Sequence, residues 1–300
     1  MHSTPSKTVY TGIAVAVLAT FIWSWNFIVA RGIYSAIPPV SLAFYRWLTA
    51  TVIIFPFAIS SFRKEWPAVK KSLLYFGLAA ASGISIFNTF VYIGARYTTA
   101  INLALIGTTS SPVLSVLFAR IFLKEHIHTT RILGMVLCIT GILFLLAKGD
   151  WHNLLHLHFT KGDLWVLGAG LSFAVYNTMV KKKPADISPV NFLFVVFLLG
   201  TLLLFPFYLK ERSTTAAVNW HPSILLIILY LGLGASVLCF WIWNIAIRRL
   251  GAGRAALFGN LIPVFSTLEA VLILGEKISW IHLLSFGLVI TGLLIANLRK

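Results

Sequence analysis

The run "NLIPVFSTLEAVLILGEKI" at residues 260–278 is almost wholly apolar, yet it contains two carboxylates, Glu269 and Glu276. The whole chain has only eight acidic residues. A carboxylate in hydrocarbon costs free energy, so it needs a partner of opposite charge or a proton. Arg46 lies within another apolar segment at a comparable depth, and we expect it to be the partner of Glu269.

The expected pair of Arg46 and Glu269 has two interpretations. In the first, the two side chains form a permanent buried ion pair that only fixes how two helices pack. In the second, Arg46 holds the carboxylate of a solute, and Glu269 takes up a proton when the pair opens. Both interpretations stay open on the sequence, and Glu269 is the candidate for proton coupling.

The composition places these residues in a lipid bilayer. Hydrophobic residues make up 59% of the chain, charged residues make up 11%, and the mean hydropathy is +0.90. Soluble domains lie far from these values. A net charge of +16 would suit a nucleic-acid-binding protein, but here the Lys and Arg residues fall in short connectors between apolar runs. We therefore expect an all-α integral membrane protein that does not bind nucleic acid.

Ten apolar runs are candidates to cross the bilayer, since one helical crossing needs about 20 residues. With the N-terminus inside, sixteen Lys and Arg residues fall on the cytoplasmic side and seven on the other side. This imbalance predicts that both termini are cytoplasmic. The expected spans are 9–30, 38–60, 71–93, 99–121, 129–147, 162–180, 189–209, 222–246, 254–274 and 280–298.

The two halves of the chain match at a displacement of 151 residues. Pro112 and Glu125 recur as Pro263 and Glu276. Further matched pairs are Asn26 with Asn177, Pro38 with Pro189, Tyr92 with Trp243, and Gly141 with Gly292. Each half holds five expected helices, an odd number, so the second copy crosses the membrane in the opposite sense. We expect inverted five-helix repeats at 9–147 and 162–298, with a site between them near mid-membrane.

Several short motifs resemble a known family. They are "IWSWNF" at 22–27, "YRW" at 45–47, and the two Pro-to-Glu segments that end in "LKE" and "LGE". These residues resemble the paired EamA-type repeats of the drug/metabolite transporter superfamily, and the resemblance covers essentially the whole chain. It implies a secondary transporter of the bacterial inner membrane, which works by alternating access. Members include exporters of amino acids and other small metabolites. The chain departs from the pattern at Lys124 and at Ser24, where a small Gly is common.

Aromatic and amide side chains recur at matched positions of the two halves. Amides in hydrocarbon must find partners across helices or on a ligand, and aromatic faces suit planar or cationic solutes. Alternatively, these side chains only bind helices together or form the interfacial aromatic belt. The candidates for the substrate pathway are Trp23, Asn26, Arg46, Asn88, Tyr92, Asn102, Tyr176, Asn177, Trp243 and Asn244.

Glu125 and Glu276 lie at the ends of two expected helices, the fourth and the ninth. A carboxylate there can accept hydrogen bonds from backbone N–H groups at the start of the following helix. Because the repeat duplicates this residue, we expect a structural role for both glutamates.

Other function classes would leave motifs that the sequence lacks. Intramembrane enzymes need paired aspartates, HExxH or a Ser–His dyad, and none of these patterns occurs. Neither the two cysteines nor the histidines of "WHNLLHLHF" at 151–159 complete a metal site. We therefore expect no enzyme, cofactor or metal. The alternative to a proton-linked carrier of small molecules is a channel or uniporter without ion coupling.

Overall fold

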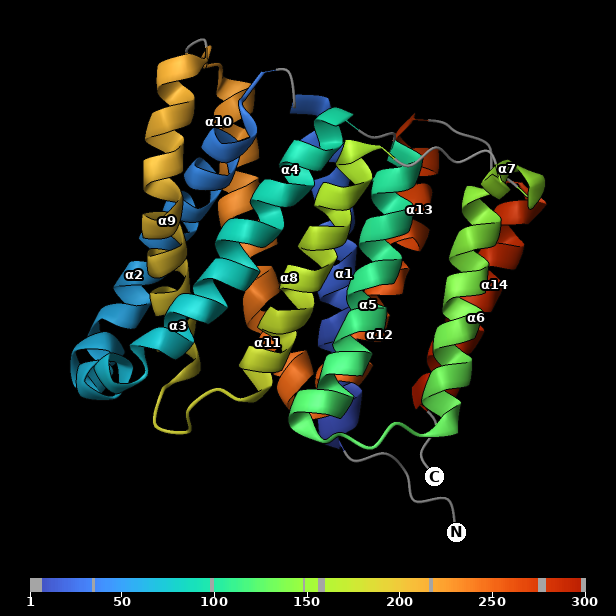
Figure 1. Ribbon diagram of the computed structural model, residues 1–300, viewed down its shortest axis with the longest axis horizontal. Helices are drawn as coiled ribbons and strands as arrows, with labels where there is room; N and C mark the ends of the chain where they lie inside the picture. The colour runs from blue at the N-terminus through green and yellow to red at the C-terminus, as the bar shows by residue number, and fades with distance from the viewer. Residues whose placement is uncertain are drawn as a thin grey trace.

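The computed structural model describes residues 7–33, 36–97, 100–147, 149–155, 160–215, 218–274 and 279–297. Every regular element in these ranges is a helix, which confirms the expected all-α class. The helices stand side by side in a bundle, and α1 starts on the same side on which α14 ends (Figure 1).

The helices follow the expected spans closely. The first half contains α1 (Lys7–Ile33), α2 (Pro39–Lys71), α3 (Leu73–Ala80), η1 (Ala81–Ile86), α4 (Phe87–Tyr97), α5 (Ala100–Leu123) and α6 (Thr129–Leu146). The connector contains α7 (His152–Leu155). The second half contains α8 (Lys161–Lys181), α9 (Pro189–Thr214), α10 (Pro222–Leu229), η2 (Tyr230–Leu238), α11 (Cys239–Leu250), α12 (Ala252–Leu257), η3 (Phe258–Leu261), α13 (Ile262–Leu274) and α14 (Trp280–Asn297).

Six helical stretches in the described part of the chain are long and apolar enough to cross a membrane. Each coincides with one of the ten expected spans. They are Thr8–Asn26, Pro39–Lys71, Leu73–Tyr97, Pro189–Thr214, Pro222–Leu250 and Trp280–Asn297. Two shorter apolar helices, Ser110–Leu123 and Thr129–Phe144, coincide with two further spans.

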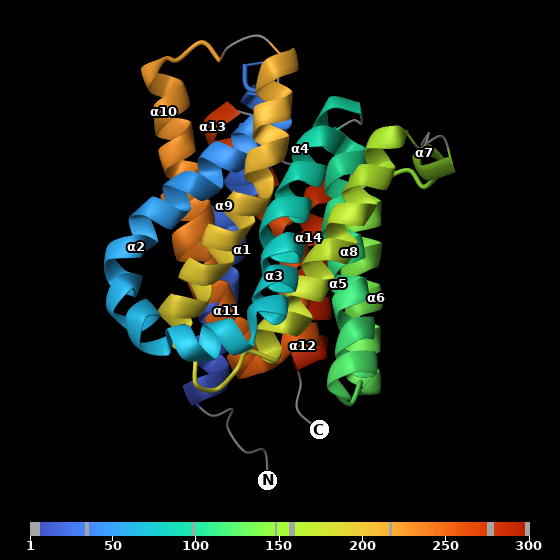
Figure 2. The ribbon, with the colours of Figure 1, turned by 60° about the vertical axis from the view of Figure 1, so that its left-hand side comes forward.

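Helix α2 differs most from its expected span, because it continues to Lys71 instead of ending near residue 60. The added turns are amphipathic: Arg63 and Lys64 are exposed, whereas Val69 is fully buried. The helix curves along its length beside α9 (Figure 2). Pro56 and Pro67 lie within it, and a proline inside a helix removes a backbone hydrogen bond and bends the axis.

Two pairs of matched helices, α6 with α14 and α2 with α9, pack against each other in antiparallel orientation. In the pair of α6 and α14, a Cβ on Gly134 or Gly292 would collide with the carbonyl oxygen of the other residue. Small residues let membrane helices approach this closely. In the same helix pair, the Sγ of Cys138 lies 3.4 Å from the carbonyl oxygen of Val289. Val289 is the counterpart of Cys138 at the 151-residue displacement.

The pair of α2 and α9 is organised in the same way. The hydroxyls of Thr51 and Thr201, which are 150 residues apart in the chain, lie 3.2 Å from each other. The π-helical segments also match, since η1 and η2 interrupt corresponding helices of the two halves. π-Helical turns are rare and frequently occur at functional sites.

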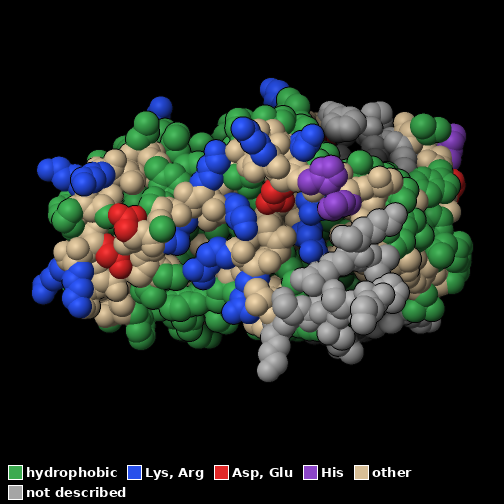
Figure 3. Space-filling view, turned by 90° about the horizontal axis from the view of Figure 1, so that it is seen from below, with side chains coloured by type: hydrophobic (Ala, Val, Ile, Leu, Met, Phe, Trp, Pro, Cys, Tyr) green, Lys and Arg blue, Asp and Glu red, His purple; other side chains and the backbone are tan. Residues whose placement is uncertain are grey.

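Lys and Arg side chains gather on the face where α1 begins and α14 ends (Figure 3). The helices α2, α8 and α11 end at this face, and Lys70, Lys181 and Arg249 in their last turns are exposed. This distribution agrees with the side to which the sequence assigned the excess of basic residues.

Candidate functional site

A cavity lies between the two halves of the chain. Its walls come from α1, α2, α4 and α5 of the first half and from α8, α11, α12, η3 and α13 of the second. The space open to the centre of a water molecule is about 60 Å³. That is room for roughly four to six water molecules, so a larger solute requires the helices to move apart.

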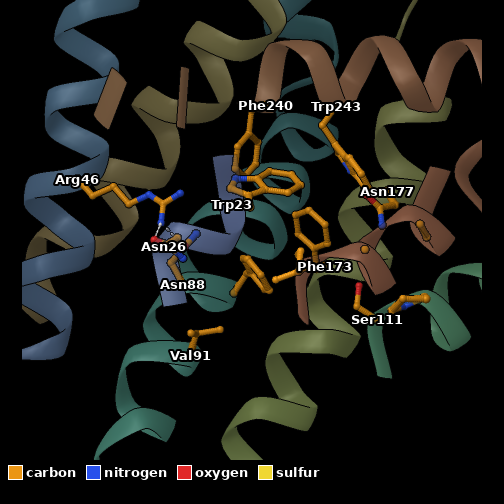
Figure 4. A pocket seen from close by; sticks show the side chains of 15 residues that line it. Trp23, Asn26, Arg46, Asn88, Val91, Ser111, Phe173, Asn177, Phe240 and Trp243 are labelled. Atoms are coloured by element: carbon orange, nitrogen blue, oxygen red, sulfur yellow. Dashed lines mark hydrogen bonds between the residues drawn. The ribbon is translucent and has the colours of Figure 1, made fainter. Parts of the chain in front are cut away.

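Six of the ten residues predicted for the pathway line this cavity. They are Trp23, Asn26, Arg46, Asn88, Asn177 and Trp243, and Figure 4 shows how they surround the space. Sequence reasoning missed other lining residues, notably Ser111, Phe173 and Phe240. Phe and Ser are so common in membrane helices that the residue type alone does not identify a cavity-lining position.

The remaining four pathway predictions have different outcomes. Tyr92 lies next to the cavity, where its hydroxyl accepts a hydrogen bond from Arg46 at 2.9 Å. Tyr176 and Asn244 bind each other outside the lining, with 2.9 Å from the tyrosine hydroxyl to Oδ1 of Asn244. Asn102 belongs to α5, but its side chain lies outside the described residues.

Arg46 is at the centre of a polar cluster that joins the two halves. It is only 1% exposed, and its guanidinium lies 5.0 Å from the ring centre of Trp47. Its hydrogen-bond acceptors are hydroxyl, amide and backbone carbonyl oxygens. They are Ser236 Oγ at 2.7 Å, Asn26 Oδ1 at 3.0 Å, and Asn88 Oδ1, Tyr92 OH and the carbonyl of Ala235 at 2.9 Å.

Ser236 and Ala235 were not predicted, and both belong to the π-helical segment η2. The Ala235 carbonyl accepts hydrogen bonds from Arg46 and also from the indole Nε1 of Trp23, at 2.8 Å. The segment "YLGLGASVL" is rich in small residues, which is the one sequence feature that marks it. Small residues alone indicate close helix packing and do not single out a π-helix.

A second polar chain lies across the cavity from Arg46 (Figure 4). The indole Nε1 of Trp243 donates to Asn177 Oδ1 at 2.9 Å, and Asn177 Nδ2 donates to Ser115 Oγ at 3.0 Å. Asn177 is the repeat counterpart of Asn26, which binds Arg46. In both halves the matched asparagine therefore joins helices while one side of it borders the cavity.

Aromatic rings form the apolar part of the cavity wall. The ring centre of Trp23 lies 5.8 Å from that of Phe173, 5.7 Å from that of Phe240 and 5.1 Å from that of Trp243. These contacts have the edge-to-face and tilted geometries that aromatic pairs prefer. Trp23 is only 9% exposed and lines the cavity.

Glu269 does not pair with Arg46 in this structure. Its carboxyl lies within hydrogen-bond distance of Ser24 Oγ on α1, and its other oxygen has no partner among the described atoms. Glu269 is 4% exposed and does not line the cavity. The sequence could not exclude the pair, because equal depth in the membrane says nothing about which way each side chain points around its helix.

Glu125 occupies a capping position, though not the expected one. Its Oε1 accepts a hydrogen bond at 3.2 Å from the backbone N–H of Ala252, at the start of α12, and its Oε2 lies 3.5 Å from Arg131. The capped helix belongs to the other half and is not the following helix in the chain. Glu276, its repeat counterpart, lies outside the described residues.

No group of three or more His, Cys, Asp or Glu side chains in the described ranges could hold a metal ion. Of the connector histidines, His156 and His158 fall outside those ranges.

Comparisons with known proteins agree with this architecture. The chain is 25% identical over 259 residues to "Uncharacterized transporter YyaM" of Bacillus subtilis, covering 86% of this chain and 84% of that protein. It is 26% identical over 291 residues to "Probable amino-acid metabolite efflux pump" of Salmonella typhimurium, covering 94% and 93%. One crystal structure has a TM-score of 0.76 at 19% identity, covers 98% of this chain and 97% of its own, and thus shares the fold.

The sequence profile described as "EamA-like transporter family" matches the chain twice, at residues 10–147 and 160–298. These two matches confirm the resemblance that the motifs indicated. The protein is therefore a membrane protein that belongs to the EamA-like transporter family.

Proposed function

We propose that the protein is a secondary transporter of small metabolites that works by alternating access through the cavity between its halves. The observation that carries the proposal is the cavity itself. Both halves of the chain contribute lining residues, which include Arg46 and three asparagines. Polar side chains in an apolar bundle are expected where a solute passes. The small cavity volume fits a conformation that must open before a metabolite can enter.

The proposed topology has ten membrane spans in two inverted repeats, 9–147 and 162–298, with both termini in the cytoplasm of a bacterial cell. Antiparallel contacts between matched residues, such as Thr51 with Thr201, support the inversion. The gathering of Lys and Arg on the face where α1 begins supports the orientation. In this arrangement one half rocks against the other, and the cavity opens to each side in turn.

Glu269 is the proposed proton-coupling residue. Ser24 Oγ lies within hydrogen-bond distance of both the Glu269 carboxyl and the carbonyl oxygen of Phe21. A hydroxyl has one proton, so it can donate to only one of these two oxygens. Both contacts are satisfied when Glu269 is protonated and donates to Ser24, which in turn donates to Phe21. The alternative is a uniporter or channel in which Glu269 only holds α1 to α13.

Amino acids and related small metabolites are the first solutes to test, because one relative bears the name of an amino-acid metabolite efflux pump. The purified protein is reconstituted into liposomes, and uptake of a labelled panel is measured with and without an imposed pH gradient. Glu269→Gln is compared with Asp186→Asn, which changes an exposed acid in the loop between α8 and α9.

We expect the gradient to stimulate wild type and Asp186→Asn but not Glu269→Gln. If Glu269→Gln responds to the gradient like wild type, Glu269 does not couple protons. If no solute enters under any gradient, the carrier proposal fails for the whole panel.

A further inference from the structure

Arg46 places a positive charge in the cavity wall, and no carboxylate in the described part of the chain forms an ion pair with it. Its hydrogen-bond acceptors are all neutral oxygens. Neutral acceptors satisfy the N–H groups of a guanidinium, but a buried charge without a counter-charge is still costly. Glu269 is bound to Ser24 and does not face the cavity. The Arg46 charge is therefore available to a solute.

Asn88 adds an unused donor next to this charge. Arginine has donors only, so the oxygen of the Asn88 amide must be the atom that faces Arg46, at 2.9 Å. The Nδ2 on the other side of the amide has no partner among the described atoms, although Asn88 is only 1% exposed. Asn88 also lines the cavity. A buried donor of this kind is satisfied when a ligand brings an acceptor.

The described lining offers no counter-charge to a solute with a cationic group. It contains no Asp or Glu side chain. An ammonium group would find aromatic faces such as that of Trp23 and neutral oxygens such as Ser111 Oγ, but no counter-charge, and the charge of Arg46 would repel it. The same aromatic faces suit the apolar skeleton of a solute. The charge of Arg46 and the donor of Asn88 beside aromatic rings therefore match a carboxylate with an apolar body.

We propose that the cavity selects organic anions, meaning solutes with a carboxylate and net negative charge, over zwitterions and amines of the same skeleton. Arg46 compensates the solute charge and Asn88 Nδ2 donates to its carboxylate, so these two residues determine specificity. The inference rests on the proposed transport function and narrows its solute class.

Two matched sets of compounds test this inference. One set is 3-phenylpropanoate, L-phenylalanine and 2-phenylethylamine, and the other is butanoate, L-2-aminobutanoate and propylamine. Affinities for the purified protein in detergent are measured by calorimetry and by ligand-dependent melting. We expect the carboxylate of a set to bind at least about tenfold more tightly than its zwitterion, because Arg46 repels the ammonium group and the zwitterion brings no net negative charge.

The decisive variant is Asn88→Asp, which is nearly isosteric and places a fixed carboxylate beside Arg46. It keeps the acceptor that Arg46 uses, so the protein should fold, and its melting temperature without ligand checks this. We expect carboxylate binding to weaken by roughly ten- to a hundredfold. The neutral control Asn88→Ala removes the donor without adding charge, and it should weaken binding less while keeping the preference for anions. Arg46→Lys should also keep that preference.

The results separate this inference from the transport proposal. If zwitterions or amines bind as tightly as carboxylates, if no carboxylate binds, or if Asn88→Asp binds them like wild type, anion selection is wrong. Uptake of the same labelled compounds into proteoliposomes is measured in parallel. Binding of anions without uptake would support the anion site and overturn the carrier. Uptake of amines alone would support the carrier and overturn the anion site.

Discussion

Glu65 caps the helix that carries Glu211, and Glu211 caps the helix that carries Glu65. Near the end of α2, Glu65 accepts hydrogen bonds from Ser188 N at 2.9 Å and Asn191 Nδ2 at 2.7 Å, at the start of α9. Near the end of α9, Glu211 accepts from Val40 N at 3.1 Å and Ser41 N at 2.6 Å, at the start of α2. The antiparallel pair is thus fastened at both ends.

We expect Glu211→Ala to destabilise the protein by about 1–2 kcal/mol, because the first N–H groups of α2 lose their charged acceptor. Glu65→Ala should have a similar effect through α9. Unfolding in detergent by heat or denaturant measures both, and Asp186→Asn serves as the control, since Asp186 is an exposed acid that caps neither helix. Equal stability of Glu211→Ala and Asp186→Asn would show that water replaces the cap without loss.

Helix α14 offers a matched pair of glycines to test how closely it packs on α6. A Cβ on Gly292 would stand 2.6 Å from the Gly134 carbonyl oxygen and 2.8 Å from Cys138 Sγ, which is closer than real Cβ contacts. A Cβ on Gly287 would meet nothing within 4 Å.

Gly292→Ala should therefore destabilise the protein by about 1–3 kcal/mol, because the helices must separate. Gly287→Ala should leave stability unchanged or raise it by up to about 1 kcal/mol, since Ala has the better helix propensity. Melting temperatures of the two variants in the same detergent check this. A smaller loss for Gly292→Ala than for Gly287→Ala would contradict the close contact.

The sequence predicted the fold well because the bilayer makes the pattern simple. An apolar run long enough to cross the bilayer and ended by Lys, Arg, Gly or Pro coincides with a membrane-length helix in six of the expected spans. Helix α9, for example, begins at Pro189, where the expected span begins. Two contacts agree with the repeat displacement found in the sequence. Cys138 and Val289 are 151 residues apart, and Thr51 and Thr201 are 150 residues apart.

The site was predicted less completely, because the sequence does not show how each helix is rotated about its own axis. Sequence places Arg46 and Glu269 at a depth, but the direction of each side chain depends on how the helix is rotated in the bundle. The structure turns Glu269 to Ser24 and Arg46 to neutral acceptors. The π-helical segment η2 contains Ser236 and shifts the register of the helical turns that follow it. No residue type in the sequence predicts such a shift.

Ser111 allows the transport pathway to be blocked without a change of charge. Its side chain lines the cavity and is 8% exposed, whereas Leu117 on the same helix is 47% exposed. In Ser111→Leu, the larger side chain fills much of the 60 Å³ cavity, since interiors of proteins are closely packed and leave little other room. We expect at least about a tenfold loss of uptake, which corresponds to about 1.4 kcal/mol, because the solute no longer fits the cavity.

The control is Leu117→Phe, which enlarges a side chain on the outer surface of α5. It should transport like wild type, and both variants should reconstitute to the same protein content. Initial rates of labelled solute uptake, taken at equal protein per lipid, make the comparison. Unchanged uptake by Ser111→Leu would place the pathway elsewhere, and equal losses in both variants would mean that bulk on α5 disturbs the fold and not the cavity.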